Sequence, residues 1–137
     1  MNEYEHITRA STVAEYQSSS TVFDGLIKEI RELSKKKPDA TMSAGKVKIV
    51  NRVLLDLMAF LHVEPEGKYL EKLDDDALPQ VSDAVLVMVQ FETALRAFKG
   101  RYHQYVSGKW LWVTEEWVAE RKAFEERYLS RAGDDDL

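Results

Sequence analysis

Residues 84–106, AVLVMVQFETALRAFKGRYHQYV, decide the fold. The β-branched run at residues 85–89 is typical of a strand, but apolar side chains recur every three or four residues along the segment, which is the period of an α-helix. These positions are Ala84, Met88, Phe91, Leu95, Phe98 and Tyr102. Pro79 suits the first turn of a helix. The pattern therefore predicts a long helix that begins at residues 78–79 and ends at residue 105 or 106.

Helical spacing continues on both sides of this segment. We expect a helix from Ser20 or Thr21 to Pro38, a second over residues 43–63, a two-turn helix at residues 69–73, and a last helix that Thr114 caps. Three prolines and six glycines are too few for the frequent turns of an all-β domain. We therefore predict an all-α fold, a single helical bundle of four long helices plus one short helix.

The length and composition limit the class of protein. The 137 residues allow one domain, 1–137, and we expect an ordered bundle over roughly 16–131 between a flexible N-terminal tail and a flexible acidic C-terminal tail. The longest apolar run, at residues 84–89, is far shorter than the roughly 20 residues that cross a bilayer. The N-terminus lacks the pattern of a secretory signal. We expect no membrane association and a cytoplasmic location.

Metal and cofactor chemistry is not indicated. The chain has no cysteine, which excludes disulfides, thiolate nucleophiles and cysteine-based metal sites, and it has three histidines. The run Asp74-Asp75-Asp76 lacks the alternating acids and the central glycine of a calcium loop, so we interpret it as a turn between helices. We predict no metal site and no cofactor.

The net charge of −5 hides alternating blocks of charge. Residues 28–52 carry eight bases against three acids, residues 53–92 carry two bases against nine acids, and residues 93–114 carry four bases and no acid. The basic candidates are Lys48, Arg52, Arg96, Lys99, Arg101 and His103. Interleaved with aromatic rings, these cations can form a patch for RNA or single-stranded DNA. The alternative is that they face the acidic blocks within the bundle.

A polar strip is expected on the long helix, because Glu92, Arg96, Lys99 and His103 are spaced four, three and four residues apart. A Glu92–Arg96 ion pair beside solvated bases is one interpretation. The other is metal-independent cleavage of RNA, in which histidine supplies the base and arginine offsets the phosphate charge. Residues 96–103, RAFKGRYH, resemble over eight residues the Arg-x(4–6)-His motif of HEPN-domain proteins, a family of helical bundles that includes metal-independent ribonucleases. The resemblance implies catalytic roles for Arg96 and His103.

Three tryptophans, Trp110, Trp112 and Trp117, crowd into eight residues. Large aromatic side chains anchor protein interfaces more often than their abundance suggests, but they can equally close the end of a small core. We assign no catalytic residue and expect a non-catalytic helical interaction or regulatory subunit that docks onto a protein partner or assembly. The alternative is a nucleic-acid-binding helical subunit, with Arg96, His103 and Glu92 as the catalytic set at its extreme. A homo-oligomer stays open.

Overall fold

The computed structural model describes residues 4–135, and its elements follow the order of the chain. They are α1 (Ala10–Lys36), α2 (Ala44–Leu61), the 3₁₀ helix η1 (Pro65–Tyr69), α3 (Val81–Tyr102), β1 (His103–Val106), β2 (Lys109–Trp112) and α4 (Glu115–Asp135). Helices dominate the described residues and the sheet has two strands, so the predicted all-α class is confirmed. None of the helices in the described part of the chain combines the length and the apolar character that crossing a bilayer requires.

Contacts divide the chain into two compact units. The first, Ala14–Lys99, is called the helical unit. The second consists of the described residues of Met1–Val13 and Gly100–Leu137 and is called the hairpin unit. The prediction of one domain is not tested by this division. Each unit is described by itself below.

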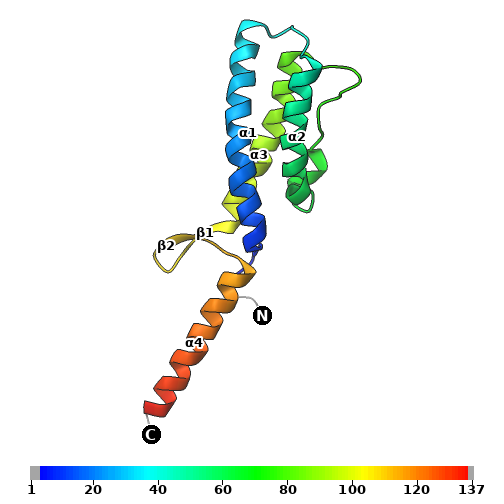
Figure 1. Ribbon diagram of the computed structural model, residues 1–137. Coiled ribbons are helices and arrows are strands. Elements are labelled where there is room, and N and C mark those ends of the chain that lie inside the picture. The colour runs from blue at the N-terminus through cyan, green and yellow to red at the C-terminus, as the bar shows by residue number, and fades with distance from the viewer. Residues whose placement is uncertain (1–3, 136–137) are drawn as a thin grey trace. The chain divides into compact units, whose positions relative to one another are not determined.

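The helical unit is a bundle of α1, α2 and α3 (Figure 1). Each helix buries apolar side chains at helical spacing, and those on α1, α2 and α3 that are at most 2% exposed are Phe23, Val47, Val50, Leu54, Leu57, Leu61, Val81, Ala84, Met88, Phe91, Ala94 and Phe98. Phe98 packs between two rings, stacked on Tyr16 at 5.2 Å and edge-on to Phe60 at 5.4 Å. Burial of these side chains supplies most of the driving force for the unit.

Side-chain caps form at the N-termini of α2 and α4, and the cap of α4 by Thr114 is the predicted one. Ser43 precedes α2, and its hydroxyl accepts a hydrogen bond from the Lys46 backbone N–H at 3.2 Å. Thr114 precedes α4, and its hydroxyl accepts from the Trp117 N–H at 3.1 Å. The end of α1 at Lys36 also agrees, because Pro38 disfavours the helical conformation before it.

Three predicted elements are wrong in part. α1 begins at Ala10 rather than near Ser20, because the Glu116 carboxylate accepts the Ala10 N–H at 2.8 Å and so replaces a local cap. The two-turn helix expected at residues 69–73 is instead η1, which starts at Pro65. α3 ends at Tyr102, and the residues that follow form a β-hairpin.

The segment between η1 and α3 is irregular, yet it is fastened to α2. Its anchors are Leu70 and Leu73, which are both buried. The side chain of Asn51, 7% exposed on α2, donates to the Leu73 carbonyl at 2.9 Å and accepts from the Leu73 N–H at 2.8 Å. One amide thus satisfies both backbone groups of a buried residue, as a neighbouring strand would.

Candidate functional site

The hairpin between α3 and α4 is the feature that the sequence reading missed. β1 and β2 pair antiparallel, with His103 opposite Trp112 and Tyr105 opposite Trp110. Both residues of the connecting turn have positive φ, 52° at Ser107 and 85° at Gly108, as a type I′ turn requires. The signal was available, because a Ser-Gly pair flanked by alternating aromatic residues is typical of a hairpin, but each strand has four residues, too few to stand out against helical periodicity.

Four aromatic side chains share one face of the hairpin, since directly opposed pairs at alternate positions project to the same side. We call this set, His103, Tyr105, Trp110 and Trp112, the aromatic face. The His103 ring lies 5.6 Å from the Trp110 ring and 4.9 Å from the Trp112 ring, and Tyr105 lies 5.5 Å from Trp110. Tyr105 is 63% exposed and Trp110 is 66% exposed. Large rings are therefore held in place by neighbours and remain open to solvent.

Arg121 of α4 contacts the turn of the hairpin. Its guanidinium donates to the Ser107 hydroxyl at 3.3 Å and to the Tyr4 hydroxyl at 2.6 Å. The same group lies over the Trp117 ring, 5.3 Å from the centroid, while its Nε donates to Glu125 at 3.2 Å. One half-buried cation thus joins the turn, the N-terminal segment and α4.

The N-terminal segment completes this support. Thr8 donates its N–H to the Val113 carbonyl at 3.1 Å and accepts from the Glu115 N–H at 2.8 Å. The Gln104 side chain donates to the His6 carbonyl at 3.0 Å. The Glu116 carboxylate accepts a hydrogen bond from the Ala10 N–H and further hydrogen bonds, and these lower the pKa of Glu116. Residues without local periodicity are therefore ordered by partners about 100 positions away.

The predicted polar strip does not exist as one helical face. His103 lies in β1, because α3 ends at Tyr102. Glu92 binds Arg31 of α1 through both carboxylate oxygens, at 2.9 and 3.0 Å, and this pairing lowers the pKa of Glu92. Arg96 lies 4.0 Å from the same carboxylate, so the expected Glu92–Arg96 pair is present but secondary. The premise of the HEPN resemblance, that Arg96 and His103 project from one helix, is wrong.

The basic candidates have different neighbours. Lys48 and Arg52 are exposed on α2, beside the segment that carries Lys72 and Asp75. Arg96 and Lys99 are exposed on α3 in the helical unit, whereas Arg101 and His103 belong to the hairpin unit. A single patch made from both sets stays a prediction.

The three tryptophans differ in exposure. Trp110 is open to solvent, whereas Trp112 and Trp117 are half-buried. Trp117 meets the Tyr4 ring edge-on at 5.4 Å, which gives it a structural contact inside the hairpin unit. The exposed member of the set is therefore the one on the aromatic face next to Tyr105.

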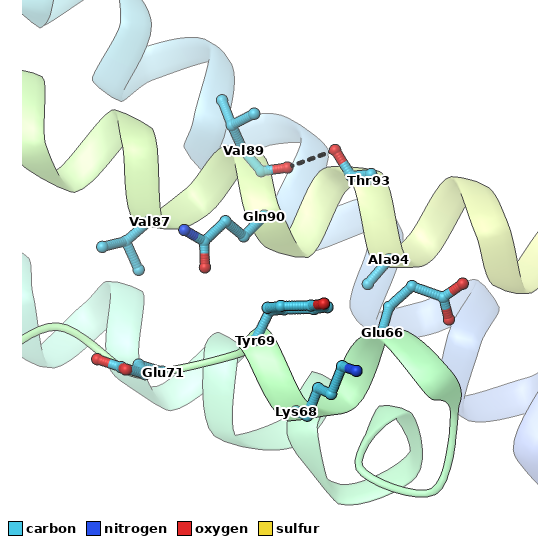
Figure 2. A pocket seen from close by; sticks show the side chains of 9 residues that line it. All are labelled: Glu66, Lys68, Tyr69, Glu71, Val87, Val89, Gln90, Thr93 and Ala94. Carbon is cyan, nitrogen blue, oxygen red and sulfur yellow. Dashed lines mark hydrogen bonds between the residues drawn. The ribbon is translucent and has the colours of Figure 1, made fainter.

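A groove of about 650 Å³ runs between η1 and α3 (Figure 2). The Tyr69 ring projects into it and is 61% exposed, with the Lys68 ammonium 5.1 Å from the ring centroid. The Thr93 hydroxyl donates to the Val89 carbonyl at 3.0 Å within α3. The residues that line the groove include no histidine, and its charged side chains are Glu66, Lys68 and Glu71.

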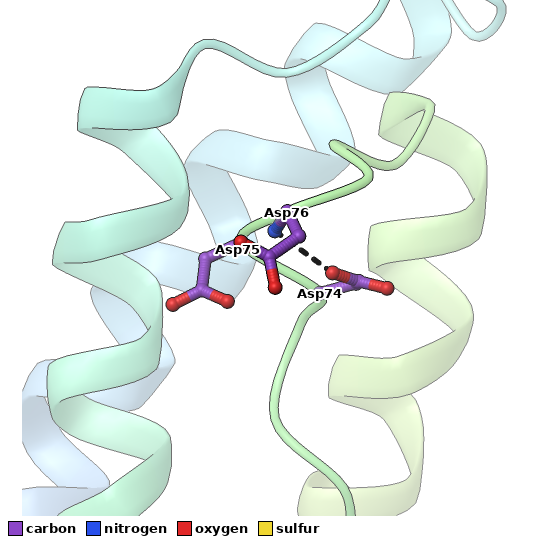
Figure 3. Close-up of side chains that lie close together, drawn as sticks. All are labelled: Asp74, Asp75 and Asp76. Carbon is purple, nitrogen blue, oxygen red and sulfur yellow. Dashed lines mark hydrogen bonds between the residues drawn. The ribbon is translucent and has the colours of Figure 1, made fainter.

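The acidic run forms a turn, as its sequence indicates. Asp74 accepts the Asp76 N–H at 2.8 Å and the Ala77 N–H at 2.9 Å, which lowers the pKa of Asp74. Figure 3 shows the Asp74 carboxylate on the α3 side of the loop and the Asp75 carboxylate on the α2 side. The three carboxylates lie within 4.8 Å of one another and are exposed; backbone N–H groups hold Asp74, and Asp75 pairs with Lys72 at 3.6 Å.

Comparison with protein-family models, with curated proteins and with solved structures finds no match to this chain.

Proposed function

We propose that this protein is a non-catalytic interaction subunit that binds a protein partner through the aromatic face of its hairpin. The observation that carries the proposal is the exposure of Tyr105 and Trp110, 63% and 66%, side by side on a hairpin whose turn is held by Arg121. Tryptophan and tyrosine are enriched among the few residues that dominate the energy of protein interfaces.

The ring contacts of Trp110 favour tight binding of a partner. Ring neighbours already restrict Trp110, since His103 stacks on it at 5.6 Å with an angle of 19° between the rings. Binding therefore has little side-chain freedom left to remove, and burial of the exposed ring surface contributes directly to affinity. A partner surface with an apolar pocket and a polar rim fits such a face.

Glu92 and His103, two of the candidate catalytic residues, have ion-pair or ring partners among the described residues, which favours a binding role. Glu92 is held by Arg31 through both oxygens, so it is not free to serve as a base for Arg96. His103 is packed against Trp110 and Trp112 in the hairpin. These contacts give Glu92 and His103 structural roles, while Arg96, 77% exposed, lies 4.0 Å from the Glu92 carboxylate.

A second candidate, binding of RNA or single-stranded DNA, is favoured by the charge of the same region. Residues 93–114 contain no acid, and Arg101 and Lys109 lie on or next to the hairpin strands. Bases stack on exposed aromatic rings and phosphates attract nearby cations. This candidate predicts an affinity that falls steeply with salt, whereas docking of an apolar pocket tolerates salt.

The test is quantitative affinity enrichment from the cells that make the protein. Wild type is compared with the double variant Tyr105→Ala/Trp110→Ala and with Tyr69→Ala/Leu86→Ala, which removes two side chains of similar exposure, 61% and 66%, from the helical unit. We expect a defined protein, which can be a second copy of this chain, to be lost with the first variant and retained with the second.

Nuclease treatment and a salt series separate the two candidates. A protein partner survives both, whereas recovery that depends on intact RNA would favour the second candidate. Equal recovery with wild type and with Tyr105→Ala/Trp110→Ala would refute a role for the aromatic face.

A further inference from the structure

A second concave surface lies in the helical unit, independent of the hairpin. It is a depression of about 560 Å³ between the outer side of α2 and the irregular segment that follows η1. Three cations border it: Lys48 and Arg52 from α2, and Lys72 from the segment. Asp75 is the one acid among the lining residues, and Ala44 and Leu55 supply apolar walls.

The charges of this depression are incompletely balanced. Lys72 forms an ion pair with Asp75 at 3.6 Å. Lys48 and Arg52 are spaced four residues apart on one face of α2, and neither forms an ion pair with any side chain described in residues 4–131. Like charges at this spacing destabilise a helix slightly, so their placement in a protein of net charge −5 is not explained by stability.

Hydrogen bonds join the two walls of the depression. Asn51 lies between Lys48 and Arg52 in the sequence of α2, lines the same depression, and makes both of its hydrogen bonds to Leu73. Leu73 is the neighbour of Lys72 in the chain. The two hydrogen bonds of the Asn51 side chain therefore hold the segment with Lys72 against α2, which carries Lys48 and Arg52. A bound anion would therefore meet cations from two backbone elements that are already fastened to each other.

We propose that this depression binds a small organic phosphate. The guanidinium of Arg52 can hold two phosphate oxygens, and the ammonium groups of Lys48 and Lys72 add point charges. Leu55, 52% exposed, and Ala44 at the first turn of α2 contact the apolar part of the molecule. The ligand competes with Asp75 for Lys72, so this carboxylate weakens binding until it is displaced.

The competition with Asp75 gives the proposal a specific signature. Replacing the carboxylate by an amide leaves Lys72 available to the anion and removes a repelling charge. Asp75→Asn is therefore expected to bind more tightly than wild type, while Lys48→Gln/Arg52→Gln binds more weakly. A purely structural ion pair would give no gain of affinity in Asp75→Asn.

The experiment is a titration of the full chain with phenyl phosphate, monitored by NMR shifts of the backbone amides. We expect shifts confined to α2 and to residues 70–76, an affinity at least about tenfold lower for Lys48→Gln/Arg52→Gln, and one several-fold higher for Asp75→Asn, because each exchange alters a charge-assisted contact. Lys28→Gln/Lys36→Gln removes the same charge from α1 and is the matched control, expected to bind as wild type.

Three results would overturn the proposal. The first is the absence of shifts around the depression at millimolar phenyl phosphate. The second is an equal loss of affinity in Lys28→Gln/Lys36→Gln, which would make the binding a general charge effect. The third is equal affinity for inorganic phosphate and phenyl phosphate, which would leave Leu55 and Ala44 without a role. Far-UV circular dichroism of every variant checks that these exposed substitutions leave the helices intact.

Discussion

Replacing Asn51 by alanine is expected to destabilise the helical unit strongly, although the change removes no apolar side chain. The amide makes two hydrogen bonds to Leu73, at 2.8 and 2.9 Å, and Leu73 is 2% exposed. The substitution leaves the N–H and the C=O of Leu73 buried without a partner, and each such group costs about 1.5 kcal/mol. The sum is about 3 kcal/mol, a large part of the roughly 5–15 kcal/mol that stabilises a domain.

This loss corresponds to a melting temperature about 10 °C lower for a chain of 137 residues. Urea unfolding followed by far-UV circular dichroism measures the free energy of unfolding, and hydrogen exchange of the Leu73 amide reports the local effect. Arg52→Ala, the exposed neighbour on α2, is the control and is expected to stay within about 0.5 kcal/mol of wild type. If Asn51→Ala unfolds at the same urea concentration as Arg52→Ala, the two hydrogen bonds between Asn51 and Leu73 do not stabilise the fold.

Three further substitutions test separate parts of the structure. Gly67→Ala should lower the free energy of unfolding by about 2 kcal/mol, because a Cβ there would lie 2.5 Å from the Leu61 carbonyl oxygen; an unchanged urea midpoint would contradict this close approach. Gly108→Ala should cost about 1 kcal/mol, since φ is 85° at that position, and should weaken the near-ultraviolet circular dichroism of the hairpin rings; an identical spectrum would argue against the type I′ turn. Glu92→Gln should cost about 1 kcal/mol at pH 7, where the partly exposed pair with Arg31 is charged. The pKa of Glu92 is lowered in the folded protein, so its contribution to the free energy of unfolding is present above the ordinary carboxyl pKa of 4.5 and is lost as pH falls through the lowered value. Urea unfolding at pH 7 and at pH 3 should therefore show that the difference in unfolding free energy between wild type and Glu92→Gln becomes smaller at pH 3. A gap that persists at pH 3 would rule out the ionic origin.

The sequence predicts those parts of the fold that local patterns determine. Most of the apolar positions that the spacing indicates are buried on α1, α2 and α3, and the cap that the sequence predicts at Thr114 forms its hydrogen bond. These features depend on residues within one or two helical turns of one another, and such signals can be read directly from the chain.

Features that depend on distant partners are missed. The start of α1 at Ala10 depends on the Glu116 carboxylate, 106 positions away, and the residues near Ala10 contain no signal that predicts it. Glu92 has a plausible partner four residues on in Arg96, but Arg31 from another helix binds it more closely. The sequence predicts a helix up to residue 105 or 106, because the four residues of β1 are too few for the alternation of a strand to outweigh the strong helical period before them.

The sequence indicates only part of the proposed site. The residue type of Trp110 favours interfaces, and its side chain is 66% exposed. The sequence does not indicate Tyr105, because a helix through residue 105 places it away from Trp110, whereas the antiparallel register places the two opposite each other. The site therefore depends on a register that composition alone does not reveal.

The most direct measurement is photo-crosslinking from the aromatic face itself. A benzophenone amino acid replaces Tyr105, 63% exposed on the hairpin, and in a separate sample it replaces Tyr69, 61% exposed in the helical unit. After irradiation in the cells that make the protein, the account predicts a defined protein adduct from position 105 that is not formed from position 69. Adducts with nucleic acid alone, or the same adducts from both positions, would contradict docking of a protein partner on the aromatic face.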